Sequence, residues 1–435
     1  MINPLSALAR RLWTPAPAFA AAGIAYPHYL LELTWLLLGR IAPEQIYAEA
    51  FPCAAWEKLW NLPEMARFHY YIQLLEDSKN ITDPHLAGIF QQAHTQLQHA
   101  AQLTQLIELV CSIHPEEYED LADSYEQLLA SHDSHAPYYL APAAALVDSL
   151  VIALQPQPGE SIQDPVAASA SFLIAAEQYT HLSDDELQAS AETQLLGKDR
   201  DLIRVRLALM NCLLHDIYHH EQVPILWEKT PHTQTLPPAD VVLSNLLFCN
   251  GSIPADNQLI LKILQAIYHN LTPQGRAAVI VPDSLLSASG NARQIRYTLL
   301  ESCHLHTVLR LPENLFYPYS LPAQVLFFHR KAAASVKNTP VWFYDLRHQA
   351  PDFMQFISAY GDDPYALQRE EKSTDPCWKS LSRAQIAAQG DNLDYSWIEA
   401  APHTPLWEAV DETLCALEDL KSLLYADVPK HPKQT

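Results

Sequence analysis

Two segments of the 435-residue chain place polar side chains where buried strands are expected to end. Asp164 and Pro165 follow one expected strand, and Asn245 follows another. In an open sheet of parallel strands, ligands bind outside the carboxyl ends of the strands, beside the switch in strand order. Both strand ends are therefore candidates for binding chemistry.

The elements that would position these side chains alternate between amphipathic helices and short strands. We expect helices over residues 142–154, 168–179, 204–217 and 258–271. We expect strands, each with its exit, over residues 159–166, 239–248, 273–282, 305–312 and 322–331. This order predicts parallel strands joined by crossover helices, and so a doubly wound α/β sheet.

Helical sequence precedes this region, and irregular sequence follows it. The sequence pattern predicts helices from residue 28 to about 132. In residues 85–113, "HLAGIFQQAHTQLQHAAQLTQLIELVCSI", the apolar residues recur at helical spacing. An acidic helix and a linker rich in Ser, His, Asp and Pro close that part. Beyond residue 345 the chain turns irregular and ends in a leucine-rich helix over 404–424. The expected domains are residues 1–135, 136–345 and 346–435.

Composition restricts the function. The formal net charge of −23 argues against a phosphate-binding surface, so any contact with DNA needs a partner or a local basic patch. The seven dispersed cysteines indicate neither disulfides nor a zinc site, and we expect a cytoplasmic protein. No run of residues is long and apolar enough to span a membrane, and prolines interrupt the start that looks like a signal peptide. Adjacent His219 and His220 point about 100° apart on a helix, and with Glu221 they do not form a zinc pair, so no metal site is expected.

The second strand end reads Asn245, Leu246, Leu247, Phe248. Enzymes that methylate the exocyclic amino group of a DNA base carry here a polar residue, two prolines and an aromatic residue. The polar group and a backbone carbonyl accept hydrogen bonds from the amino group, the prolines fix the loop, and the ring stacks on the flipped base. By themselves, Asn245 and Phe248 could equally be a loop cap and a core aromatic residue.

Long ordered matches support the first interpretation. The chain resembles the modification subunit of type I restriction-modification systems, which is an N6-adenine DNA methyltransferase. The resemblance covers nearly the whole chain and includes "DLADSYEQLL", "LLGKDRDLIRVRLALMNCLLHDI" and "WKSLSRAQIAAQGDNLDYSWI"; its most specific part is "LTPQGRAAVIVPDSLLSASGNARQIRYTLLESCHLHTVLRLPENLFYPYSLPAQVLFFHRK". It implies a Rossmann-like S-adenosylmethionine-dependent methyltransferase domain between a helical N-terminal domain and a mostly helical C-terminal tail.

The first strand end departs from the family pattern in its middle. The family's cofactor loop reads Asp, Pro, x, Cys, Gly, Thr, Gly, Gly, Phe, Leu. Here its glycines correspond to Ala168, Ala170 and Ser171, and its cysteine to Ala167. Glycine serves such a loop by adopting positive φ and by leaving bare backbone beside the cofactor, so we expect severely weakened S-adenosylmethionine binding. The ends of the pattern are kept in Asp164, Pro165, Phe172 and Leu173.

Asp199, in "GKD", matches the family's acidic residue for the cofactor ribose, whereas the next expected acidic position, after "HDI", is not evident. The leading hypothesis is a catalytically impaired or inactive homologue, a structural or regulatory subunit of a DNA-modification or defence complex. Its expected partners are a specificity subunit or an active methyltransferase-like subunit, with DNA held through the complex. One alternative is an active N6-adenine methyltransferase, in which Asn245 and Phe248 bind the adenine and Asp164 and Asp199 bind the cofactor. Another alternative is a binding module that holds a different ligand in the former cofactor pocket.

Overall fold

The computed structural model describes residues 5–130, 142–181, 193–218, 222–228, 237–248, 257–316, 321–330, 340–347, 352–367, 369 and 377–395. All of these belong to the compact unit Met1–Tyr395. The helix expected over 404–424 and the linker expected after residue 130 lie outside the described residues. In the described part, no helix is long and apolar enough to cross a membrane.

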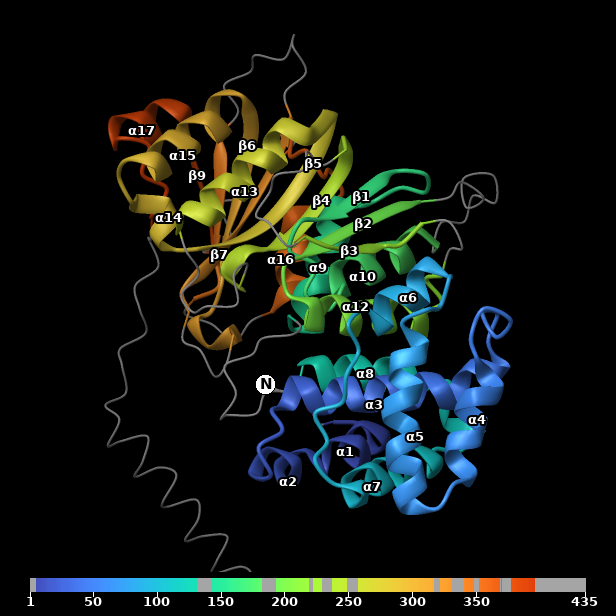
Figure 1. Cartoon of the computed structure of the whole chain (residues 1–435). Helices are drawn as coiled ribbons and strands as arrows, with labels where there is room; N and C mark the ends of the chain where they lie inside the picture. Colours follow the sequence, from blue (N-terminus) through green and yellow to red (C-terminus); the bar gives the residue numbers. More distant parts are fainter. Residues whose placement is uncertain are drawn as a thin grey trace, which may run out of the picture. The chain divides into compact units, whose positions relative to one another are not determined.

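The N-terminal part is helical, as expected (Figure 1). Its longest helix, α3, is buried along almost its whole length, because apolar residues occupy nearly every face of it. Trp35 and Tyr29 of α3 are among the largest fully buried side chains. The helices of this part are α1 (Ala7–Trp13), α2 (Ala16–Ala21), α3 (Tyr26–Ile41), α4 (Cys53–Asn61), α5 (Glu64–Ser78), α6 (Pro84–Phe90), α7 (Ala100–Cys111) and α8 (Leu121–Ala130).

The helical expectation for residues 85–113 holds only at the two ends of that segment. Helix α6 ends at Phe90 and α7 begins at Ala100, and the chain between them is not helical. The buried carboxylate of Glu32 stabilises this path, because it accepts hydrogen bonds from Thr95 Oγ1 and from the backbone N–H of Gln96, both at 2.7 Å. A contact across more than sixty residues thus overrides the local helical pattern.

Replacing Thr95 with Val is expected to lower the free energy of unfolding by about 1–2 kcal/mol. The change removes the donor to Glu32 and the acceptor of the Leu97 N–H, while it keeps the side-chain volume. Thr104→Val is the matched control, because the Thr104 hydroxyl is buried without a hydrogen-bond partner among the described residues and its loss is expected to be neutral or stabilising. Urea denaturation of both variants checks this, and equal effects would contradict it.

The second part is a nine-stranded sheet in the order β3-β2-β1-β4-β5-β7-β6-β8-β9. Neighbouring strands from β3 to β5 are parallel, and β7 runs antiparallel to both β5 and β6. This arrangement confirms the α/β, Rossmann-like class. The strands are β1 (Ser161–Asp164), β2 (Gln194–Asp199), β3 (Ile225–Trp227), β4 (Ala239–Asn245), β5 (Leu271–Pro282), β6 (Cys303–Arg310), β7 (Ala323–Arg330), β8 (Val341–Asp345) and β9 (Trp378–Leu381).

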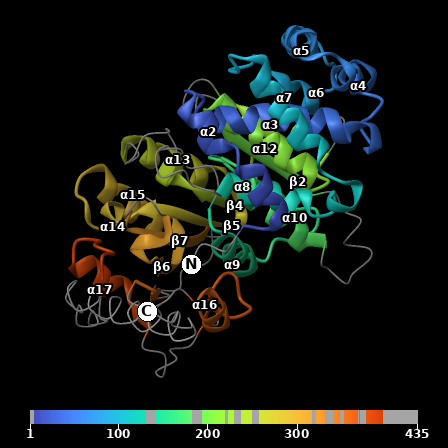
Figure 2. The same ribbon diagram turned by 90° about the horizontal axis from the view of Figure 1, so that it is seen from below.

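Helices cover the two faces of the sheet in separate groups. Helices α13, α14 and α15 lie together on one face, and α9, α10 and α16 lie on the other (Figures 1 and 2). Helix α12 packs against α3 and α6 of the N-terminal part. The bounds are α9 (Ala144–Leu154), α10 (Ser171–His181), α12 (Leu202–Leu214), α13 (Asn257–Asn270), α14 (Ser284–Ser287), α15 (Asn291–Glu301), α16 (Phe353–Tyr360) and α17 (Arg383–Ala388).

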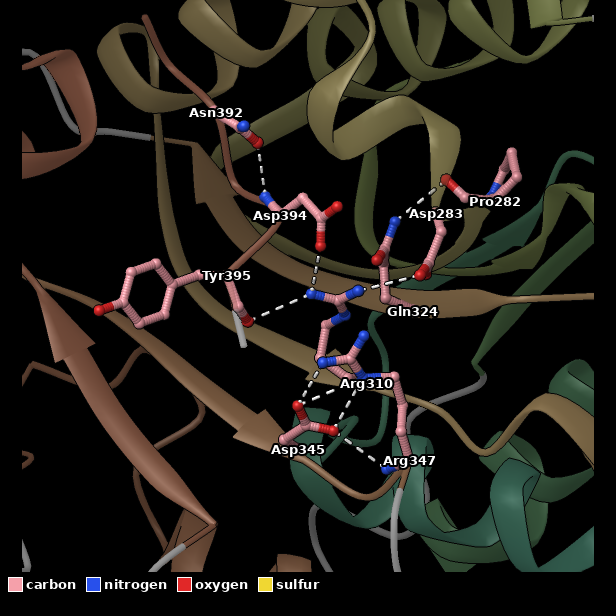
Figure 3. Close-up of polar contacts among 9 residues, drawn as sticks. All are labelled: Pro282, Asp283, Arg310, Gln324, Asp345, Arg347, Asn392, Asp394 and Tyr395. Carbon is pink, nitrogen blue, oxygen red and sulfur yellow. Dashed lines mark hydrogen bonds and ion pairs between the residues drawn. The ribbon is translucent and has the colours of Figure 1, made fainter. Parts of the chain in front are cut away.

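The sheet continues beyond residue 345, because β9 pairs with β8. After β9 the chain returns to the end of β6, where Arg310 forms hydrogen bonds with residues 394 and 395. The guanidinium of Arg310 donates to the carboxylates of Asp283 at 2.9 Å and Asp394 at 3.0 Å, and to the carbonyl of Tyr395 at 3.2 Å (Figure 3). Strands from both sides of residue 345 thus share one sheet, and the domain boundaries stay predictions.

Candidate functional site

The carboxyl ends of β1 and β4 meet at one hollow, and the end of β2 lies beside it. Asp164 ends β1 and Asn245 ends β4, and these parallel strands are neighbours in the sheet. The hollow is lined by Pro142, Asp164, Val166, Ala167, Ala168, Ser169, Ser171, Phe172, Arg204 and Asn245.

Asp164 is 1% exposed. Its Oδ1 accepts hydrogen bonds from the Val166 N–H at 2.9 Å and from the Ser244 hydroxyl at 2.6 Å. Burial raises the pKa of this carboxyl to about 7, against the lowering effect of those two donors. Asp164 therefore holds the start of the loop in place and carries a partial proton at neutral pH.

The loop after β1 keeps a glycine-type backbone although the glycines are gone. Ala168 has φ +47° and Ala170 has φ +66°, both in the left-handed region. Ala168 is one of the residues that line the hollow. Ala170 is fully buried and does not line this hollow, so its place at the cofactor site stays a prediction. Its cost is conformational strain.

Ala168→Gly is expected to raise the free energy of unfolding by about 1 kcal/mol, because glycine adopts positive φ without a steric penalty. Ala175→Gly is the matched control. Ala175 is also half-buried but lies inside helix α10, where glycine costs about 1 kcal/mol. Denaturant unfolding should give opposite signs for the two variants, and a loss of stability in both would contradict the strain.

Asp199, at the end of β2, is engaged by groups of the chain itself. Its carboxylate accepts hydrogen bonds from the backbone N–H groups of Ala168 at 3.1 Å and Asp201 at 2.8 Å. Its Oδ1 also lies 3.0 Å from the guanidinium of Arg204, which is 3% exposed. Burial raises the pKa of Asp199, and the charge of Arg204 opposes that shift. Asp199 thus ties the loop after β1 to the first turn of α12.

Asn245 turns back onto its own loop. Its Oδ1 accepts a hydrogen bond from the Leu247 N–H at 3.1 Å, and Leu246 and Leu247 are buried. Phe248 is the last residue of a short 3₁₀ turn, Leu246–Phe248, and its side chain lies outside the described part. The predicted base-binding segment is therefore a closed turn at the end of β4.

The structure brings most of the residues singled out in the sequence to one place, whereas their roles stay predictions. Pro165 and Phe172 are buried, and Ser171 faces Ser169 with 2.8 Å between the hydroxyl oxygens. Arg204 was missed, although it lies five residues after Asp199, and Ser244 was placed at the strand end without a role. His219, His220 and Glu221 lie outside the described residues. Among the described residues, no group of three or more His, Cys, Asp or Glu side chains is placed to hold a metal.

The sheet order, with β7 antiparallel to its neighbours, defines a Rossmann-like α/β fold. The chain belongs to the N-6 DNA Methylase family, whose model matches residues 116–359. This match, together with the methylase subunits described next, confirms the resemblance to modification subunits.

Individual relatives extend the match over nearly the whole chain. The EcoKI methylase subunit of Escherichia coli K12 is 30% identical, over 96% of this chain and 94% of that protein. The StySJI methylase subunit of Salmonella typhimurium LT2 matches to the same extent. The crystal structure of the EcoKI M protein superposes with a TM-score of 0.53 at 27% identity, covering 98% of each chain. A structure from a study of complex assembly in the type I R-M system gives a TM-score of 0.71 at 19% identity, covering 98% of this chain and 100% of that one, and so agrees in fold.

Proposed function

We propose that this chain is a type I modification-subunit homologue whose methyl transfer is impaired or lost. In this proposal it serves a DNA-modification or defence complex as a structural or regulatory subunit. The observation that carries the proposal is the left-handed backbone at Ala168 and Ala170, where the loop has kept its shape without the residues suited to it.

The poor fit of S-adenosylmethionine to the loop after β1 supports the proposal. S-Adenosylmethionine would supply the methyl group of the family reaction. Ala168 and Ser171 line the hollow between the strand ends, where the family pattern has glycines. Asp199 already accepts two backbone hydrogen bonds and faces Arg204. Cofactor binding would have to displace or share these contacts, so the residues present fit the cofactor poorly.

The charge of the chain bears on its partners. With a net charge of −23, the protein has little long-range attraction for DNA phosphates. We therefore propose that DNA contact comes through the complex, with a specificity subunit or an active methyltransferase-like subunit supplying positive charge.

Transfer of labelled methyl groups to DNA tests the proposed function. The full chain, mixed with its specificity subunit, should label DNA no more than a sample without the chain. Two restored variants accompany it: Ala168→Gly with Ala170→Gly and Ser171→Gly, and the same three changes with Leu246→Pro and Leu247→Pro. Methyl transfer to DNA should rise in the variant with all five substitutions. Transfer by the unmodified chain at the level of an active modification subunit would overturn the proposal.

An active N6-adenine methyltransferase is the second candidate. It is favoured by Asp164 and Asn245, which both line the same hollow at neighbouring strand ends. In that case Asn245 would accept hydrogen bonds from the adenine amino group, Phe248 would stack on the ring, and Asp164 and Asp199 would hold the cofactor. The same transfer assay decides between the two candidates.

A further inference from the structure

Only one of the two polar atoms of the Asn245 side-chain amide has a hydrogen-bond partner among the described residues. Its oxygen accepts the hydrogen bond from the Leu247 N–H at 3.1 Å. Its nitrogen, Nδ2, is buried and has no hydrogen-bond partner among the described residues. The residue is 7% exposed and lines the hollow at the ends of β1 and β4. A buried donor without a partner is costly, so this atom needs a ligand or a water.

The identity of residue 247 causes this arrangement. A proline at position 247 has no N–H and could not donate to Asn245. Leucine supplies the donor, and an asparagine readily closes a turn onto the N–H two residues further along the chain. The hydrogen bond also fixes the plane of the amide, so the direction of the second lone pair of the oxygen is set as well.

We propose that the Leu247 N–H is a positioning group that reverses the hydrogen-bond polarity of Asn245. The side chain then presents its NH₂ group, a donor, to a ligand in the hollow. The matching ligand carries a hydrogen-bond acceptor, such as the keto oxygen of a base, and an exocyclic amino group is disfavoured because two donors would meet. This inference rests on the expectation, taken from the family resemblance, that residues 245–248 contact a base, and it does not depend on the cofactor.

The size of the effect follows from the unpaired donor. Satisfying a buried donor should give about a tenfold preference for the ligand that carries the acceptor, which is about 1.4 kcal/mol. The preference should reverse when the oxygen of Asn245 is released from Leu247. A residue with only a structural role would change overall affinity and leave the order of the two ligands unchanged.

Adenine and hypoxanthine are suitable probes, because the two purines are alike in size and differ in whether C6 carries an amino or a keto group. The full chain, labelled with ¹⁵N-asparagine, is titrated with each base in the absence of cofactor. The side-chain amide signal of Asn245, identified by its loss in Asn245→Ser, reports binding at this position. Leu247→Pro removes the N–H, and Leu246→Pro is the matched control that keeps it.

The unmodified chain and Leu246→Pro should bind hypoxanthine about tenfold more tightly than adenine, and Leu247→Pro should reverse the order. An adenine preference in the unmodified chain, or no response of Asn245 to hypoxanthine, would overturn the inference. An unchanged order in folded Leu247→Pro would also overturn it. If that variant does not fold, the comparison in the unmodified chain decides alone. Because no cofactor is present, cofactor binding in a separate experiment would contradict the proposed function without affecting this result.

Discussion

Asp164→Asn is expected to stabilise the protein by roughly 4 kcal/mol at pH 8 and to leave it nearly unchanged at about pH 4. The reason is the buried carboxyl, whose pKa burial raises from 3.8 to about 7. The unfolded chain loses this proton near pH 4, whereas the folded chain keeps it until about pH 7. The folded state therefore binds more protons in this interval, and its stability falls as the pH rises, then levels off above the folded-state pKa.

Urea denaturation from pH 4 to 8 measures this difference. Asparagine keeps the acceptor for Val166 and Ser244 and cannot ionise, so the variant should lack this part of the pH dependence. Asp240→Asn is the control of opposite sign. Burial works to raise the pKa of Asp240, but hydrogen bonds from Ser161 and Thr272 outweigh it and lower the pKa, so loss of that carboxylate should destabilise above about pH 4. A stability difference between Asp164→Asn and the unmodified chain that does not change with pH would contradict the buried, partly protonated carboxyl.

The second large effect is expected at the cluster around Arg310 (Figure 3). The double variant Asp283→Asn, Asp394→Asn should lose about 3 kcal/mol of stability, because it removes both carboxylates that Arg310 touches. The side chain of Arg310 is 1% exposed, so its charge cannot turn to water. Asp345 attracts it through space but is already paired with Arg347 at 2.7 Å.

Adding Arg310→Met to the double variant should recover much of that loss, since the buried charge is removed together with its partners. Glu301→Gln is the control at the more exposed pair of Glu301 and Arg383, and it should cost well under about 1 kcal/mol. Guanidinium or urea unfolding of the set checks the prediction. A triple variant less stable than the double variant would show that an uncompensated charge on Arg310 is not what destabilises the double variant.

The sequence predicts the central strands well, because their signals are local. β4, β5, β6 and β7 are apolar segments bounded by turns, and each forms where expected. β2 was not predicted as a strand, and tertiary packing explains it: a β-carbon on Gly197 would lie 2.5 Å from Ile225 and 2.8 Å from Ala167, so the glycine allows close approach. β3 has three residues and β9 has four, too few to give a clear alternating pattern.

At the site, residue types could be predicted but not their partners. The positive φ at Ala168 and Ala170 follows from glycines expected at those positions. Nothing in the local sequence shows that Ala170 faces the core or that Arg204 pairs with Asp199, because both depend on how α12 packs beside the loop. The hydrogen bond from Leu247 to Asn245 could be predicted only in part. The sequence shows that residue 247 has an N–H, but not that this N–H donates to Asn245.

Isothermal titration of S-adenosylmethionine into the purified full chain measures whether the loop after β1 still binds the cofactor. No measurable heat of binding is expected for the unmodified chain, and measurable binding is expected once Ala168, Ala170 and Ser171 are replaced by glycine. Micromolar binding by the unmodified chain would contradict it.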